Sequence, residues 1–264
     1  MKLPEREKSS HKGERGRVAI VAGSKDYYGA PIFNALGAEC SGADLITLFL
    51  PEQHLQVAKS SSLNLFLREY VKGNLGLKDL GLILKECESN HVLLMGSGLG
   101  RDQDTLRVIK LILENVRIPV VLDAEALFPD ILEIKHEANW VVTPHVGEFK
   151  RLFGMDATEA KVIECAKNHG LTVLLKAPVD IISDGVSTYI NATGCPEMRV
   201  GGTGDGLAGI VASFISQGFS PFDAACSAAH YFGLAGEDLA KHNYCFTTQE
   251  IIKHFPKFIR AHTS

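Results

Sequence analysis

Several features that mark specialised classes of protein are missing from this sequence. Among its 264 residues no apolar run is long enough to cross a membrane, and the polar segment 1–15 has no hydrophobic stretch of the signal-peptide type. Its 27 Lys and Arg are scattered among 31 Asp and Glu, so no basic patch indicates binding to nucleic acid or to a membrane surface. We therefore expect a cytoplasmic protein that binds neither.

Cysteine chemistry is also unsupported. The six cysteines lie far apart, with no C-x-x-C pair and no histidine beside them at metal-ligand spacing. We expect reduced, mostly buried thiols, and we regard Cys195 as a neighbour of the site described below, because nothing near it marks a nucleophile. The 45% hydrophobic and 22% charged residues are typical of one globular domain with a sizeable core.

The order of apolar and amphipathic segments predicts an α/β fold. A β-branched run at 17–23, a helix at 32–41 and an apolar run at 43–50 form a βαβ unit, whereas residues 53–84 give no clear pattern. Asp184-Gly185 predicts a hairpin between strands at 180–183 and 187–191. Further strands are expected at 92–95, 119–123, 139–143 and 172–176. Further helices are expected at 105–115, from the Gly147-Glu148 pair to about 153, and at 158–168, 222–241 and 248–260. We expect one domain over 1–264, a mostly parallel sheet with helices on both faces, in three α/β/α layers.

Polar residues follow several predicted strands, where parallel sheets bind ligands. They are Gly23, residues 96–100, Asp123, residues 143–148 and Lys176. The Gly-x-Gly-x-Gly at 96–100 lacks the third glycine spacing of a dinucleotide fingerprint, which argues against a Rossmann site. Two simpler interpretations remain open: His145 as a solvent-facing loop residue, and Lys176 extending its ammonium group to solvent.

The glycine-rich segment 201–205, Gly-Gly-Thr-Gly-Asp, is the most informative motif. It precedes an apolar run at 207–215 with helical spacing, so a flexible loop leads into a helix N-terminus. Free N–H groups and the helix dipole make such a junction suited to phosphate or to developing negative charge. Asp205 could cap this helix or act in the chemistry of a site.

The motifs together resemble one known family, the ADP/ATP-dependent NAD(P)H-hydrate dehydratases. The resemblance covers the chain from about residue 11 and implies a ribokinase-like fold. It is carried, in order, by Arg17-Val-Ala-Ile-Val-Ala-Gly-Ser24, Tyr28-Gly-Ala-Pro31, Gly96-Ser-Gly-Leu-Gly100, Leu122-Asp-Ala-Glu-Ala-Leu127, Thr143-Pro-His-Val-Gly-Glu148 and Gly201-Gly-Thr-Gly-Asp-Gly-Leu-Ala-Gly209. Gly-Gly-Thr-Gly-Asp is shared by other ribokinase-like enzymes, whereas the Thr-Pro-His-x-Gly-Glu motif and the Gly-Ala-Pro loop point to this family.

This resemblance implies a repair reaction. The (S) form of hydrated, inactive NADH or NADPH would be dehydrated to the working cofactor while an adenine nucleotide, ADP or ATP, is hydrolysed. Most prokaryotic members of the family use ADP and release AMP and phosphate. Mg²⁺ would bridge the phosphates. The resemblance also implies a homo-oligomer, most simply a tetramer. We expect no N-terminal epimerase domain in this chain.

Phosphorylation of the C6 hydroxyl would turn it into a good leaving group, so the enzyme needs mainly a kinase step. Our hypothesis is that Asp205 takes the hydroxyl proton while the N–H groups of Gly202, Thr203 and Gly204 stabilise the transferring phosphoryl group. By resemblance, the hydrated dinucleotide contacts Ala30, Gly98, His145 and Asp205, and the adenine nucleotide contacts Lys176, Ala177, Pro178, Val179, Asp180 and Gly204.

Two departures from the family pattern concern the nucleotide. Ala177 and Glu197 stand where the family usually has glycine, which leaves the choice between ADP and ATP open. Two other functions also stay open from the sequence. One is a small-molecule kinase of the same fold acting on an alcohol such as a vitamin precursor, and the other is a nucleotide-binding module without turnover.

Overall fold

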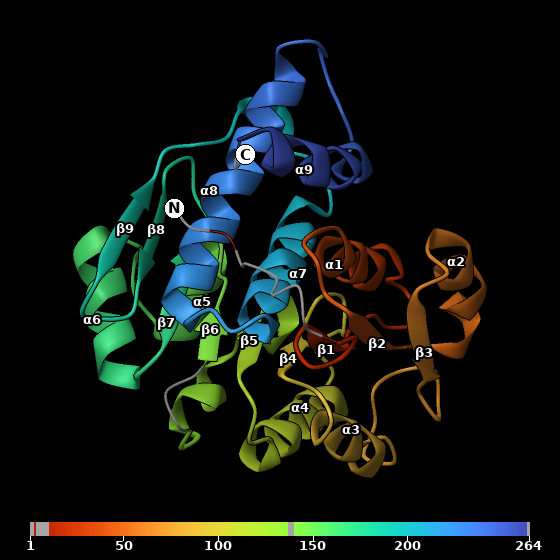
Figure 1. Ribbon diagram of the computed structural model, residues 1–264. Helices are drawn as coiled ribbons and strands as arrows, with labels where there is room; N and C mark the ends of the chain where they lie inside the picture. The colour runs from red at the N-terminus through yellow and green to blue at the C-terminus, as the bar shows by residue number, and fades with distance from the viewer. Residues whose placement is uncertain (1–2, 4–10, 137–139, 263–264) are drawn as a thin grey trace.

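The computed structural model describes Leu3 and the segments 11–136 and 140–262 (Figure 1). Within these residues, nine strands form one sheet in the order β3-β2-β1-β4-β5-β6-β7-β8-β9. β1 to β7 run parallel, and β8 and β9 form the antiparallel hairpin at one edge. The strands are β1 Arg17–Val21, β2 Leu45–Leu50, β3 Leu65–Glu69, β4 Val92–Met95, β5 Val120–Leu122, β6 Trp140–Val142, β7 Thr172–Leu175, β8 Asp180–Ser183 and β9 Thr188–Asn191.

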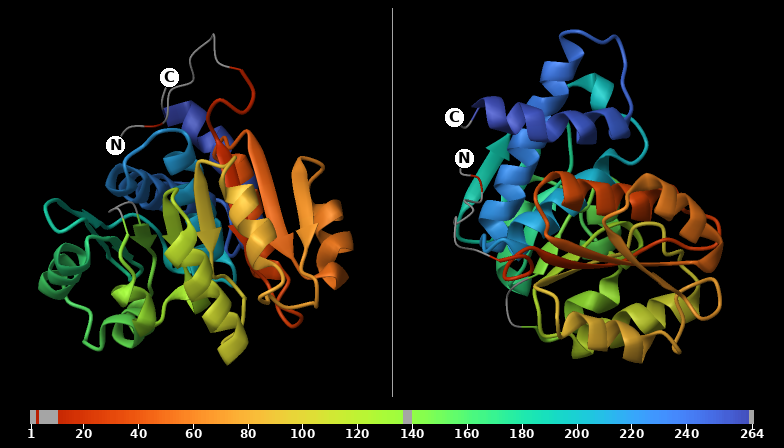
Figure 2. Two further views of the ribbon diagram at one scale, coloured as in Figure 1. Left: turned by 90° about the horizontal axis from the view of Figure 1, so that it is seen from below. Right: turned by 45° about the vertical axis from the view of Figure 1, so that its right-hand side comes forward.

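Helices cover both faces of the sheet, which gives the three α/β/α layers (Figure 2). One face carries α1 Gly29–Cys40, α2 Leu55–Ser61, α7 Thr203–Ser216, α8 Pro221–Ala240 and α9 Thr248–His262. The other carries α3 Leu80–Cys87, α4 Gln103–Asn115, α5 Val146–Phe153 and α6 Glu159–His169. Short 3₁₀ turns η1 to η4 occupy Glu52–His54, Ala124–Ala126, Pro129–Glu133 and Pro196–Met198.

Each central strand contributes to two hydrophobic cores. Val18 and Ile20 of β1 pack into the core beneath α1 and α7, whereas Ala19 and Val21 pack into the core beneath α3 and α4. This follows from the alternation of side chains along a strand, and it explains why β1 is apolar at nearly every position. The predicted three-layer α/β fold is confirmed. No described helix has the length and hydrophobicity needed to span a bilayer.

Most predicted elements are observed within a few residues of their expected bounds, and three differences are informative. The helix predicted at 32–41 begins earlier, at Gly29, and it accommodates Pro31 in its first turn, where a missing N–H removes no intrahelical hydrogen bond. β3 lies in the region 53–84 that gave no pattern. The predicted strand at 139–143 is observed as Trp140–Val142, and its first predicted residue, Asn139, lies outside the described residues.

Close packing of α1 against α7 fixes the position of the glycine-rich motif. A Cβ at Gly37 would collide with the Gly206 carbonyl O, and a Cβ at Gly209 would collide with the Asn34 carbonyl O. These two glycines therefore allow the helix backbones to approach closely. Asn34 Nδ2 also donates a 2.8 Å hydrogen bond to the Asp205 carbonyl O. The first turn of α7 is thereby held against α1 beside the loops of the sheet.

Candidate active site

The loops after β1 and β4 meet as the sequence predicted. The Gly23 N–H donates to the Ser97 carbonyl O at 2.8 Å. Gly98 lies so close to the start of α1 and to the loop before it that a Cβ there would be 3.0 Å from Tyr27 Cβ and 3.5 Å from Ala30 Cβ. Ala30 and Gly98, both predicted to contact the hydrated dinucleotide, are therefore neighbours in space.

The loop after β5 packs against the glycine loop at 96–100. Gly96 has a φ of 131°, and a Cβ there would collide with the Asp123 carbonyl O. Ala124 adopts φ 50°, in the left-handed region that few non-glycine residues occupy. The Glu125 carboxylate accepts a 2.9 Å hydrogen bond from the Gly98 N–H. The strained turn at 123–125 thus holds the glycine loop in place.

A charged cluster lies beneath these loops. Lys176 Nζ forms a 2.7 Å ion pair with Asp123 Oδ1, which also accepts a 2.8 Å hydrogen bond from Thr143 Oγ1. Ser97 Oγ lies 3.4 Å from the other oxygen of Asp123. The interpretation that Lys176 extends to solvent is wrong, because its side chain is only 19% exposed and turns inward to this carboxylate.

Lys176 stays protonated in this cluster. Burial lowers the pKa of Lys176, but the negative charges of Asp123, Glu148 and Asp205 outweigh burial, and the net pKa is raised. Asp205 responds in the opposite sense. Burial and the charge of Asp123 raise the pKa of Asp205 to about 7, although Ser97 and Lys176 act to lower it. A carboxyl group that titrates near neutrality is suited to accept a proton during turnover.

The start of α7 exposes hydrogen-bond donors. Gly202 is the N-cap, with φ 93°, so Asp205 lies in the first turn of the helix and does not cap it. Within the described residues, the N–H groups of Gly202, Gly204 and Asp205 have no hydrogen-bond acceptor, whereas the Thr203 N–H makes a long 3.4 Å bond to Val200 O. These donors lie at the positive end of the helix dipole.

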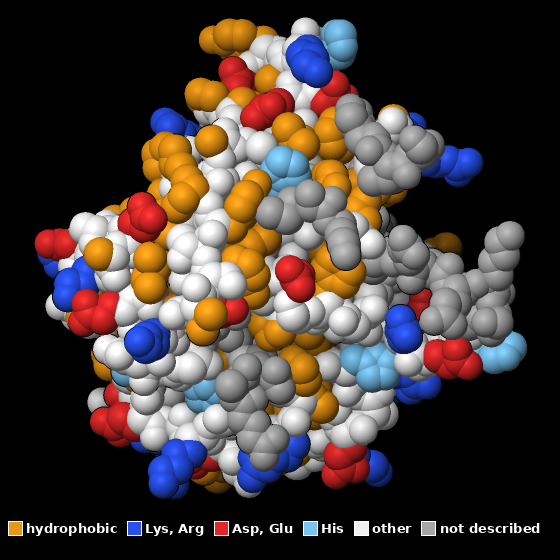
Figure 3. Space-filling model, turned by 60° about the vertical axis from the view of Figure 1, so that its left-hand side comes forward, with side chains coloured by type: hydrophobic (Ala, Val, Ile, Leu, Met, Phe, Trp, Pro, Cys, Tyr) orange, Lys and Arg blue, Asp and Glu red, His pale blue; other side chains and the backbone are white. Residues whose placement is uncertain are grey.

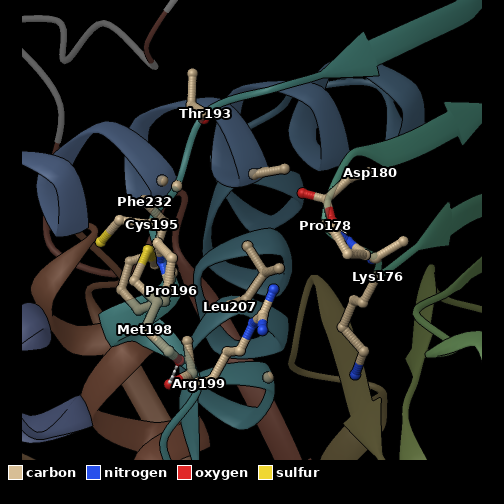
Figure 4. Close-up of a pocket in the computed structure, with 16 residues that line it drawn as sticks. Lys176, Pro178, Asp180, Thr193, Cys195, Pro196, Met198, Arg199, Leu207 and Phe232 are labelled. Carbon is tan, nitrogen blue, oxygen red and sulfur yellow. Dashed lines mark hydrogen bonds between the residues drawn. The ribbon is translucent and has the colours of Figure 1, made fainter.

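A cavity of about 620 Å³ opens beside this helix end (Figure 4). It is lined by Lys176, Ala177, Pro178 and Asp180 after β7, by the loop from Thr193 to Arg199 apart from Glu197, and by parts of α7 and α8, Gly204 among them. Val179 is 46% exposed and lies outside the lining, in contrast to its predicted neighbours. Five of the six residues predicted to contact the nucleotide therefore share one cavity.

Asp180 fixes the loop on one side of this cavity. Its carboxylate accepts hydrogen bonds from the Ala177 N–H and from Asn191 Nδ2, each at 3.0 Å. Burial raises the pKa of Asp180, while these two hydrogen bonds and the charge of Lys176 act to lower it. Its oxygens thus have a structural role at the β7–β8 turn.

His145 is the N-cap of α5. Its Nδ1 accepts hydrogen bonds from the N–H groups of Gly147 and Glu148, and the buried Glu148 carboxylate accepts from the His145 N–H at 2.9 Å. The neutral ring therefore carries its proton on Nε2. Its backbone pairs with that of Lys176, and its side chain is 59% exposed, which is compatible with both a loop residue and a ligand contact.

The cysteines form no disulfide and no described group of three His, Cys, Asp or Glu side chains is arranged to hold a metal ion. Three thiols are buried, Cys40 and Cys195 are half-buried, and Cys245 is exposed. Cys195 lines the cavity, as expected for a neighbour of the site. Burial and a hydrogen bond with Glu197 raise the pKa of Cys195, so the thiol stays protonated beside that carboxylate.

The sequence motifs gave no role to two members of the site. Asp123 was recognised as a residue after a strand and as part of the motif at 122–127, but its pairing with Lys176 joins positions 53 residues apart. Arg199, which lines the cavity, had no motif of its own. The position of Asp123 at a strand end, within the motif at 122–127, was a signal, whereas Arg199 had none.

Comparison with known proteins identifies the family. A family model described as NAD(P)H-hydrate dehydratase matches residues 18–257. The chain is 40% identical over 250 residues to an ADP-dependent (S)-NAD(P)H-hydrate dehydratase of Nitrosopumilus maritimus, with 90% of this chain and 86% of the relative covered. It is 37% identical to a bifunctional NAD(P)H-hydrate repair enzyme of Methanothermobacter thermautotrophicus, covering 97% of this chain but spanning about half, 52%, of that relative.

Solved structures share the fold. A ribokinase-like superfamily protein of Enterococcus faecalis superimposes with a TM-score of 0.87 at 27% identity, covering 98% of this chain and 92% of that one. An ADP/ATP-dependent NAD(P)H-hydrate dehydratase of Bacillus subtilis, co-crystallised with ATP and Mg²⁺, gives a TM-score of 0.86 at 24% identity, with 98% and 94% covered. The ribokinase-like architecture predicted from the sequence is confirmed.

Proposed function

Because the chain belongs to the NAD(P)H-hydrate dehydratase family, we propose that it dehydrates (S)-hydrated NADH and NADPH with ADP, giving AMP and phosphate. The observation that carries this proposal is the position of Asp205. Its carboxyl group, with a pKa raised to about 7 by burial and by Asp123, lies in the first turn of α7 beside unbonded N–H groups.

The first step is phosphoryl transfer. Asp205 accepts the proton of the C6 hydroxyl as the hydroxyl oxygen attacks the β-phosphorus of ADP, and the bond from that phosphorus to the bridging oxygen breaks to release AMP. The N–H groups of Gly202 and Gly204 and the ammonium of Lys176 stabilise the negative charge of the transferring group. Thr203 contributes less than its neighbours, because its N–H already bonds Val200 O.

The second step is elimination. The lone pair of the ring nitrogen expels phosphate as the C6–O bond breaks, and loss of the proton on the adjacent carbon restores the dihydropyridine. Phosphate is a far better leaving group than hydroxide, so the protein has mainly to bind and orient the ester at this stage. The reaction consumes one ADP for each cofactor repaired.

The two substrates would occupy adjoining spaces. Ala30 and Gly98 are neighbours, and the backbone of His145 pairs with that of Lys176, so we assign the hydrated dinucleotide to the loops that carry Ala30, Gly98 and His145. Lys176, Ala177, Pro178, Asp180 and Gly204 line the cavity, and we assign the adenine nucleotide to it, with Val179 at the rim.

Mg²⁺ would enter as the magnesium complex of the nucleotide. Mg²⁺ usually keeps several water ligands and is held through phosphates and one or two carboxylates. The described residues, which hold no preformed three-ligand cluster, fit that mode of binding and supply no metal cage of their own.

The two departures from the family pattern differ in weight. Ala177 lines the cavity, so its methyl group would face the nucleotide. Glu197 lies outside the lining and interacts with the Cys195 thiol. We therefore expect Ala177 to influence the choice between ADP and ATP more than Glu197 does.

The proposal extends to assembly and location. Figure 3 shows hydrophobic side chains gathered along the middle of one face, with most charged side chains toward its margins. Such a surface supports association between copies of the chain, and we propose that the protein is a cytoplasmic homotetramer.

The test is a coupled assay on the purified protein. Hydrated NADH and Mg²⁺ are mixed with ADP or with ATP, and the return of reduced-nicotinamide absorbance and the release of phosphate are followed together. We expect recovery with ADP and one phosphate for each cofactor restored. Folded protein that restores no absorbance with either nucleotide, or that yields a stable phosphorylated product, would refute the proposal.

A further inference from the structure

We propose that Arg199 binds a phosphate group of the adenine nucleotide in the cavity beside Lys176. This inference rests on the proposed function, because it concerns the nucleotide assigned to that cavity. It adds a contact that neither the motifs nor the pattern of the family supplied.

Arg199 is positioned by a rigid loop. The 3₁₀ turn η4 (Pro196–Met198) is closed by the Arg199 N–H, which donates to Pro196 O at 3.1 Å. On the other side, Thr203 Oγ1 lies 2.9 Å from Met198 O and 3.0 Å from Val200 O. The backbone on both sides of Arg199 is therefore tied to the first turn of α7, and its side chain starts from a fixed point.

The guanidinium of Arg199 extends into the cavity. Figure 4 shows the side chain leaving the wall formed by Pro196 and Met198 and pointing toward the space between Leu207 and Lys176. Within the described residues no carboxylate pairs with Arg199 and no hydrogen bond engages its guanidinium. Five N–H donors in a planar fork are thus available for an oxyanion.

The charges around the cavity favour such a cation. The positive charge of Lys176 is paired with Asp123 at 2.7 Å and faces Asp205 as well. Asp180 adds a further carboxylate to the lining. A nucleoside diphosphate would therefore enter a region in which carboxylates partly offset the charge of Lys176, and Arg199 supplies a positive charge that no described carboxylate pairs with. Arginine and phosphate oxygens form paired, charge-assisted hydrogen bonds.

The experiment measures nucleotide binding separately from turnover. Mg·ADP is titrated by calorimetry into wild-type protein and into Arg199→Ala, Arg199→Lys and the control Arg107→Ala, an exposed arginine of α4 that lines a different hollow. A lost hydrogen-bonded charge contact predicts ~10- to 100-fold weaker ADP binding for Arg199→Ala. Arg199→Lys keeps the positive charge but loses the planar guanidinium, so its affinity for ADP should lie between those of the wild type and Arg199→Ala. The affinity of Arg107→Ala should match that of the wild type.

Steady-state kinetics identify which substrate Arg199 contacts. We expect the KM for ADP to rise in Arg199→Ala with the KM for hydrated NADH unchanged, and the salt dependence of ADP binding to become shallower. An equal loss of AMP affinity would assign the contact to the phosphate that AMP and ADP share, and a loss confined to ADP would assign it to the terminal phosphate. Both results support the proposal.

Opposing results are distinct. ADP binding that is unchanged in Arg199→Ala, or a loss that appears only in the KM for hydrated NADH, overturns the role of Arg199 while leaving the proposed function in place. Wild-type protein that binds no adenine nucleotide contradicts the proposed function as well. Thermal unfolding of each variant identifies any that fail to fold, and Arg199→Lys then carries the test.

Discussion

The pH dependence of catalysis should shift in opposite directions in two variants beside Asp205. The charge of Asp123 raises the pKa of Asp205 above the effect of burial alone, whereas Ser97 lowers that pKa by interacting with the ionised carboxylate. Asp205 must be ionised to accept the hydroxyl proton, so kcat/KM should fall as the pH drops below about 7 in the wild type. Asp123→Asn removes the like charge, and Ser97→Ala removes the favourable contact.

The size of each shift follows from the interaction that is lost. A like charge in a partly shielded site contributes on the order of 1 kcal/mol or more, and each pH unit corresponds to about 1.4 kcal/mol. Asp123→Asn also frees Lys176 from its 2.7 Å ion pair, so the ammonium can favour ionised Asp205 further. We expect the acid limb of kcat/KM to move down by ~1 pH unit in Asp123→Asn and up by ~1 in Ser97→Ala, where a hydrogen bond to a charged group is lost.

The assay is kcat/KM for hydrated NADH at saturating Mg·ADP from pH 5 to pH 9, with Asp130→Asn, an exposed carboxylate with 64% of its side chain accessible, as the control. The readout is the position of the limb and not the level of activity, because Asp123→Asn also disturbs the position of Lys176. The reasoning is refuted if both limbs stay at the wild-type pH, or if both move in the same direction.

Three further substitutions test other parts of the site. Asp205→Asn should lose ~10²- to 10⁴-fold in kcat. The pKa of Asp205 is raised from 3.8 to about 7 in the native state, so between these pH values the native state binds more protons than the unfolded state. Wild-type stability therefore falls as the pH rises from about 4 to about 7. The asparagine of the variant does not titrate, so the thermal midpoint of Asp205→Asn should exceed that of the wild type by more at pH 8 than at pH 5. Gly204→Ala should weaken Mg·ADP binding in calorimetry, because the new Cβ would lie 3.1 Å from Lys176 Nζ. The thermal midpoint should not fall, because alanine favours a helix more than glycine does. Unchanged ADP affinity would contradict this prediction. Gly96→Ala should cost ~2–4 kcal/mol in urea unfolding, since φ 131° is strained for alanine and its Cβ would collide with the Asp123 carbonyl, and a variant as stable as wild type would show that the loop yields without cost.

The sequence predicted the parallel sheet because its central strands are buried on both faces. β1, β4 and β5 read as uninterrupted apolar runs between turn residues. β3 escaped notice because it is an edge strand, where three of its five residues, Phe66 among them, are exposed and where Arg68 and Glu69 give no alternation. Burial on one side only leaves a weaker pattern in the sequence.

The same contrast applies to the site. Glycine motifs can be recognised because backbone conformation requires glycine, as at Gly202 with φ 93°. The inward pairing of Lys176 could not be predicted, because it depends on Asp123 from another strand and on Thr143 from a third. Arg199 likewise gains its importance only from the cavity that α7 and the β7–β8 turn form around it.

The central claim, that the C6 hydroxyl is phosphorylated before it leaves, can be tested by following the oxygen atom. NADH hydrate is prepared with ¹⁸O in the C6 hydroxyl and incubated with the protein, Mg²⁺ and ADP, and the released phosphate is analysed by mass spectrometry as the reduced-nicotinamide absorbance returns. The account predicts one ¹⁸O atom in each phosphate, because the C6–O bond breaks after that oxygen has bonded to phosphorus. Recovery of the cofactor with unlabelled phosphate, and with the label in water, would contradict it.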